Sequence, residues 1–248
     1  MSTNTQDPTN LPGRGWVAPV LLFAVSMYFW ESTLIYPFKL LVVFFHELSH
    51  GISAIITGGS IERIDIFANE GGLCTTRGGW APLLYTAGYL GSLLWGSSLL
   101  LVATKTRFDQ EAVTALGMLV LIVTGLYIRN AAGIVFGLGF GIGLLVLSKY
   151  AGEWVCDQFL RYLGLTSSLY VVRDIKSDLI DRSIAESDAS RMGAMLFGMP
   201  GWVVGIVWLV IALAIVYWTI GVAIGKEDEV SDSNPFPRPV EPGNKDLF

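Results

Sequence analysis

Long apolar segments recur along this 248-residue chain, each about as long as a helix that crosses a bilayer. The apolar runs cover about 16–36, 38–57, 81–103, 112–128, 131–148 and 200–224. A membrane-spanning helix needs about 20 predominantly apolar residues, because only helices and closed barrels satisfy their backbone groups in lipid. Only 15% of the residues are charged, well below the roughly 25% of soluble proteins. We therefore predict an all-α polytopic membrane protein with six transmembrane helices, or seven if the more polar segment 153–175 also crosses.

The two ends of the chain differ in composition from the apolar part. Residues 1–15 are polar, and residues 226–248 are acidic and contain several prolines. Segments of this composition cannot bury enough apolar surface to fold. We expect a disordered N-terminus over 1–15, one integral membrane domain over 16–225, and a disordered acidic tail over 226–248.

A short polar stretch interrupts the apolar pattern between residues 60 and 79. Ile64 and Ile66 alternate with charged neighbours, and Glu70-Gly71-Gly72 is typical of a turn. This pattern predicts a short β-hairpin directly after the second apolar helix. Later apolar runs carry glycines at four-residue spacing, at 133, 137 and 141. We interpret this spacing as close helix packing rather than as a flexible gate.

The chain has two histidines, and both lie in the second apolar run, in the sequence His46-Glu47-Leu48-Ser49-His50. On a helix, His46 and His50 lie one turn apart on the same face, so both imidazoles can bind one Zn²⁺. Glu47 then lies within reach of a metal-bound water and can act as the general base. Ionisable groups are costly in a membrane helix, which favours a functional role over simple packing.

A catalytic zinc commonly has three protein ligands, so one ligand must come from elsewhere in the chain. Cys74 and Cys156 are isolated, and we interpret both as ordinary thiols. The remaining candidates are the downstream carboxylates Glu153, Asp157, Asp174, Asp178, Asp181, Glu186 and Asp188. Asp174 directly follows an apolar stretch that could carry it to the membrane edge, and Asp178 shares its helical face. We predict Asp174 as the third ligand, with Asp178 as the alternative.

The segment HELSHGISAIITGG, the expected hairpin and the later AGYLGS resemble the site-2 protease family of intramembrane zinc metalloproteases, in particular its shorter B-like branch. The resemblance implies that His46, His50 and Asp174 bind zinc and that Glu47 is the catalytic base. The stretch Asp174-Ile175 with Asp178-Leu179 and Ser187-Asp188-Ala189 also resembles a recurring pattern of this branch. Two positions depart from the family: Ser49 replaces a glycine, and Arg173-Asp174-Ile175 replaces Leu-Asp-Gly.

We therefore expect an intramembrane zinc metalloprotease that cleaves membrane-spanning protein substrates. It would be a multi-pass protein of the plasma (cytoplasmic) membrane. A regulatory partner is also possible. The hairpin could pair with an extended substrate by strand addition. No cluster of Lys and Arg is present to bind nucleic acid. Two other hypotheses are a catalytically inactive membrane scaffold with the same fold and a metal-ion transporter.

Overall fold

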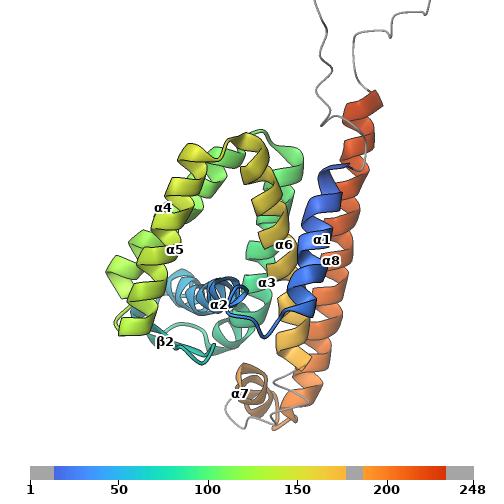
Figure 1. Ribbon diagram of the computed structural model, residues 1–248. Coiled ribbons are helices and arrows are strands. Elements are labelled where there is room, and N and C mark those ends of the chain that lie inside the picture. Colours follow the sequence, from blue (N-terminus) through green and yellow to red (C-terminus); the bar gives the residue numbers. More distant parts are fainter. Residues whose placement is uncertain (1–13, 177–186, 233–248) are drawn as a thin grey trace, which may run out of the picture.

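The computed structural model describes residues 14–176 and 187–232 (Figure 1). Its elements, in chain order, are α1 (Arg14–Tyr28), α2 (Tyr36–Ile56), β1 (Ser60–Ile66), β2 (Gly72–Arg77), α3 (Ala81–Lys105), α4 (Asp109–Tyr127), α5 (Ala131–Tyr150), α6 (Glu153–Lys176), α7 (Asp188–Met195) and α8 (Gly201–Asp232). The chain is thus an all-α protein with one two-stranded antiparallel sheet, as predicted. The predictions for residues 1–13 and 233–248 lie outside the described residues.

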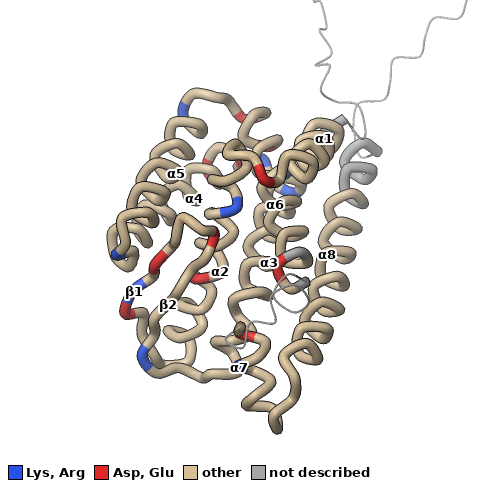
Figure 2. The backbone as a smooth tube through the Cα atoms, turned by 60° about the horizontal axis from the view of Figure 1, so that its bottom comes forward, with Lys and Arg blue, Asp and Glu red and all other residues tan. Residues whose placement is uncertain are grey.

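Five of the described helices are long and apolar enough to cross a membrane: α2, α3, α4, α5 and α8 over Gly201–Ile224. Helix α1 has a shorter apolar part, Trp16–Tyr28. In Figure 2 the charged residues gather on the hairpin and near helix ends, and the coloured part of α8 has none. These features identify an integral membrane protein, and the choice between six and seven crossings stays a prediction.

Two helix boundaries differ from those expected from the apolar runs. Helix α1 ends at Tyr28 instead of continuing to about residue 36, because the polar segment around Glu31 forms turns that lead into α2. Glu31 then lies 3.7 Å from the ammonium group of Lys39, on the first turns of α2. Helix α8 continues past the expected end at 224 to Asp232, since helical hydrogen bonds can persist where the chain leaves the apolar region.

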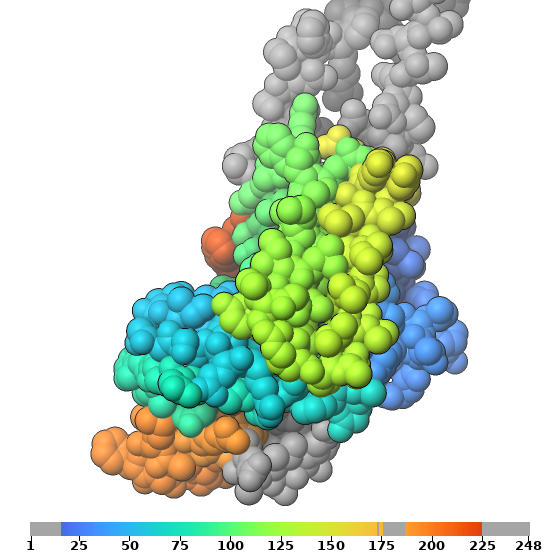
Figure 3. All heavy atoms as spheres, turned by 90° about the vertical axis from the view of Figure 1, so that its left-hand side faces the viewer, coloured from blue at the N-terminus to red at the C-terminus, as the bar shows by residue number. Residues whose placement is uncertain are grey.

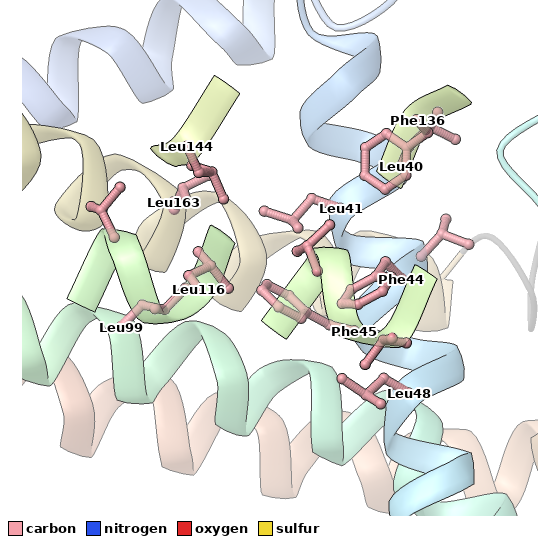
Figure 4. Packing of buried hydrophobic residues seen from close by; sticks show 14 of the residues in the cluster. Leu40, Leu41, Phe44, Phe45, Leu48, Leu99, Leu116, Phe136, Leu144 and Leu163 are labelled. Atoms are coloured by element: carbon pink, nitrogen blue, oxygen red, sulfur yellow. The ribbon is translucent and has the colours of Figure 1, made fainter. Parts of the chain in front are cut away.

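Helix α2 is the central element of the fold and is buried on most of its surface. Pro37 stands in its first turn, where proline is tolerated, and Gly58 ends it with a left-handed φ of 84°. Figure 4 shows Leu41, Phe44 and Phe45 of α2 packed among side chains of the surrounding helices. Because every turn of α2 contacts other elements, the two histidines on it are held in fixed positions.

The hairpin lies against α2 and against the connection between α4 and α5. Ile64 pairs with Cys74, and Ile66 pairs with Gly72. On its other edge β1 is already occupied: Arg129 N donates to Ile64 O at 3.3 Å, and the Asn130 side chain bonds both Ile66 N (3.0 Å) and Ile66 O (2.6 Å). Within the described part of the chain, only β2 therefore offers an outer edge that is not paired to a connecting segment.

Two side chains of α2 fix the turn of the hairpin. Lys39 is buried, and its ammonium group lies 3.0 Å from the carboxylate of Glu70. The Tyr36 hydroxyl donates to Ala68 O at 2.8 Å. The hairpin turn is thus tied to the helix that carries the histidines.

The glycine spacing reflects close helix packing, as predicted. A methyl group at Gly141 would lie 2.7 Å from Leu121 of α4, and one at Gly137 would collide with Thr124. On α3, a methyl group at Gly96 would lie 2.8 Å from Ser167 and Ser168 of α6. These small residues let α5 approach α4 and let α6 approach α3.

Candidate metal centre

His46 and His50 project from the same face of α2, with ring centroids 4.8 Å apart. The carboxylate of Asp188 lies between them: its Oδ2 is 3.2 Å from His46 Nε2 and 3.0 Å from His50 Nε2. Within the described ranges, these three residues form the one group of His, Cys, Asp or Glu whose ligand atoms all lie within 4.8 Å of each other. The structure therefore brings together two imidazoles and one carboxylate.

Asp188 reaches the histidines because it begins α7. Ser187 caps this helix and accepts a hydrogen bond from Ser190 N at 3.2 Å, so Asp188 stands in the first turn. Helix α7 packs on α3 and α8, with Ala189 and Gly193 buried. The position of the carboxylate is therefore set by a capped helix.

The structure places Asp188, and not the predicted ligand Asp174, between the two imidazoles, while the metal ligand itself stays a prediction. Asp174 lies on α6, near enough for its charge to act on His46, but Asp188 supplies the oxygen beside both imidazoles. The alternative ligand, Asp178, lies outside the described residues. In the sequence, the apolar neighbours of Asp174 favour it as a ligand. The signal for Asp188 was instead the serine before it, an N-cap that starts a short helix.

The surroundings of His50 favour metal binding. His50 Nδ1 lies 2.7 Å from Leu84 O, so Nδ1–H donates to this carbonyl and the ring is oriented with Nε2 facing Asp188 at 3.0 Å. Metal-binding histidines commonly show this arrangement. Gly88 of α3 faces the same atoms: a methyl group there would lie 2.6 Å from His50 Nε2 and closer still to His46 Nε2. Glycine at this position thus leaves space next to the ligand atoms.

The three donor atoms fit a zinc ion by type and spacing. Zinc binds nitrogen and oxygen at about 2.0–2.2 Å. Tetrahedral ligands at that range lie roughly 3.4 Å apart by simple geometry, close to the separations from Oδ2 to the two imidazoles. Burial opposes ionisation of Asp188, but the adjacent imidazoles outweigh it and hold the pKa of this carboxyl below its ordinary value. The carboxyl is therefore ionised at neutral pH, which metal binding requires.

Glu47 lies on the side of α2 that the hairpin covers. Its carboxylate is buried and accepts a hydrogen bond from the backbone N–H of Cys74 in β2. Gly72 lies directly against it: a methyl group there would be 2.6 Å from Glu47 Cγ and nearer to the carboxylate oxygen. The strand thus fixes the direction of the Glu47 side chain.

The sequence profile of the family described as Peptidase M50B-like matches residues 18–219. The match includes the two histidines, Glu47, the hairpin and Asp188. The chain belongs to this family, the B-like branch of the site-2 proteases, which are membrane metalloproteases. No curated protein and no solved structure gives a significant match.

Proposed function

We propose that this protein is an active intramembrane zinc metalloprotease that cleaves peptide bonds of membrane-spanning proteins. The observation that carries the proposal is the placement of Asp188 Oδ2 at 3.2 and 3.0 Å from the Nε2 atoms of His46 and His50. Glu47 lies next to this group in sequence and on the same helix. All four groups of a zinc hydrolase are therefore present, which argues against the inactive scaffold.

His46, His50 and Asp188 would hold the ion. Bound zinc lowers the pKa of a water molecule toward about 7 and polarises a substrate carbonyl. The chain's own contribution is Glu47, which takes a proton from the attacking water and returns it to the leaving amine. Cys74 N–H orients this carboxylate, and Leu84 O fixes the His50 ring.

The substrate would bind in an extended form along the outer edge of β2. The outer edge of β1 is held by Arg129 and Asn130, so strand addition there is blocked. The Cys74 N–H that points away from β1 bonds Glu47. A peptide strand added at this edge would therefore run beside the catalytic base and the histidines. Helical substrates must first unwind, because helix hydrogen bonds shield their carbonyls.

The proposed location is the plasma membrane, and the proposed partners are the lipid bilayer and a membrane-spanning substrate. A regulatory partner chain would be compatible with this arrangement. Nucleic acid has no part in the proposal, and a transport role would need further ionisable groups along a path through the bilayer.

The experiment compares Glu47→Gln with the wild-type protein. Both are reconstituted in liposomes with a panel of single-span membrane proteins, and cleavage is followed by mass spectrometry. Glu47→Gln should keep its zinc and lose cleavage, because the base acts on water and is not a ligand. The matched control is Glu62→Gln, which changes an acidic side chain on β1 that pairs with Arg77 and should cleave normally. Unchanged proteolysis in Glu47→Gln would refute the proposal.

A further inference from the structure

Four large apolar side chains in and beside the turn between α7 and α8 are exposed. Met195, Phe197, Met199 and Trp202 have exposed fractions of 51%, 102%, 38% and 57%. Phe197 is thus fully exposed. Figure 1 shows this turn at the lower end of α8, and in Figure 3 the orange atoms of this region form the lower edge of the molecule.

The backbone of this turn holds Phe197 outward in a conformation that aromatic residues rarely adopt. Phe197 has a φ of 58°, and Gly198 follows with 74°. Only one other non-glycine residue in the described ranges, Glu70, has a positive φ. Left-handed backbone is unfavourable for a bulky side chain, and such strain usually persists where function requires it. Because Phe197 packs on nothing in the part of the chain that the structure describes, we look for the compensating contact outside the chain.

The length of α8 indicates what that contact is. Its apolar span Gly201–Ile224 has 24 residues, or about 36 Å of helix, enough for a hydrocarbon core of about 30 Å. Yet the uncharged sequence starts earlier, at Met192. The segment before Gly201 is therefore not needed to cross the membrane, and it lies where the span meets the bilayer surface. Trp202 at the start of the span is typical of this interface.

We propose that Met195, Phe197, Met199 and Trp202 form an interface anchor that inserts among the lipid headgroups and upper acyl chains. The partner is the bilayer itself, because these side chains are apolar, uncharged and continuous with a membrane span. Such an anchor would sit about 5–10 Å deep in the boundary region.

The interface anchor also fixes α7 and hence Asp188. A methyl group at Gly193 would collide with Met199 O, and one at Gly201 would lie 2.6 Å from Ser190 Oγ. Leu196 N donates to Met192 O at 3.0 Å. Helix α7 and the turn are therefore packed together as one unit. This second part rests on the proposed function, in which Asp188 is a metal ligand, whereas the anchoring itself does not.

The first experiment measures depth and needs no activity. A nitroxide label is placed at Phe197→Cys, in full-length protein carrying Cys74→Ala and Cys156→Ala, reconstituted in phosphatidylcholine and phosphatidylglycerol vesicles. We expect the label to collide with oxygen and not with a water-soluble nickel chelate. The matched control, Phe108→Cys, changes another exposed aromatic residue, 65% exposed, which lies between α3 and α4 and is flanked by Arg107 and Asp109. Its label should collide with the chelate. Collision of the label at 197 with the chelate would place it in water and overturn the proposal. Collision with neither reagent would place it against protein and would overturn the proposal as well.

The second experiment substitutes Phe197 by Asn, which tolerates left-handed backbone better than Phe. If the turn had only a local role, Phe197→Asn would be neutral or stabilising. The interface anchor predicts the opposite: zinc affinity in vesicles, measured by chelator competition, should fall roughly 10-fold, as when a supporting contact of a metal ligand is lost. Phe108→Asn should bind zinc like the wild type. Wild-type zinc affinity in Phe197→Asn would refute the link to Asp188, whatever the depth measurement gives.

Discussion

The substitution Gly88→Ala tests whether the space beside the histidines belongs to a metal site. Gly88 lies on α3, and an added methyl group would stand 2.6 Å from His50 Nε2. Ordinary contacts begin near 3.4 Å, so the methyl group or the ring must move by about 3.4 − 2.6 = 0.8 Å. His46 Nε2 would have to move further.

Movements of this size are large for a metal site. Ligand distances in metal sites are reproducible to about 0.2 Å, so a shift of about 0.8 Å breaks the coordination. We expect zinc affinity to fall by at least about 10-fold to 100-fold. Overpacking should lower the free energy of unfolding by roughly 1–3 kcal/mol. The gain from replacing a helical glycine, about 0.5–1 kcal/mol, offsets only part of this loss.

The assay is competition for zinc between the purified protein and a fluorescent chelator, together with thermal unfolding of the same samples. The matched control is Gly143→Ala on α5, because a methyl group there meets nothing within 4 Å. This control should keep wild-type zinc affinity. The reasoning is refuted if Gly88→Ala remains folded and binds zinc as tightly as the wild type.

Two further predictions concern the hairpin. Asn130→Ala removes both side-chain hydrogen bonds to the buried Ile66 backbone, so the free energy of unfolding should fall by roughly 1–3 kcal/mol. The control in thermal unfolding is Asn69→Ala, which loses one exposed hydrogen bond of 3.3 Å. Equal losses of stability in the two variants would contradict the prediction for Asn130. Burial, and after it the Glu47 carboxylate, raises the pKa of the Cys74 thiol to about 12. The reactive thiolate is therefore scarce, and the rate of iodoacetamide alkylation should increase about tenfold per pH unit from pH 7 to 10. Glu47→Gln should accelerate the alkylation of Cys74. An alkylation rate that levels off near pH 9 would indicate an ordinary thiol pKa and contradict the prediction.

Much of the fold could be predicted because it depends on local patterns. Apolar runs of about 20 residues marked most of the long helices, and the alternation at Ile64 and Ile66 marked the hairpin. The histidine pair could be predicted from its spacing of one helical turn alone. The helix ends were less predictable: α1 ends at Tyr28 because of the polar turns around Glu31, a boundary that a window average over apolar residues does not resolve.

The carboxylate beside the histidines could not be identified from the sequence alone. Several carboxylates lie on and after α6, and their local surroundings in the sequence favour Asp174. The carboxylate that lies beside both imidazoles, Asp188, is placed there by the packing of α7 on α3 and α8, which is a long-range property. The occupied edge of β1 depends in the same way on Asn130, 64 residues from its partner Ile66. Neither contact leaves a periodic signal in the sequence.

The most direct test of the metal centre is the zinc content of Asp188→Asn and Asp174→Asn, measured by mass spectrometry after purification in lipid nanodiscs. Both substitutions keep the size of the side chain and remove one negative charge. We predict close to one zinc per chain for the wild type and for Asp174→Asn, and a large loss for Asp188→Asn. Loss of zinc from Asp174→Asn with retention in Asp188→Asn would contradict the centre formed by His46, His50 and Asp188.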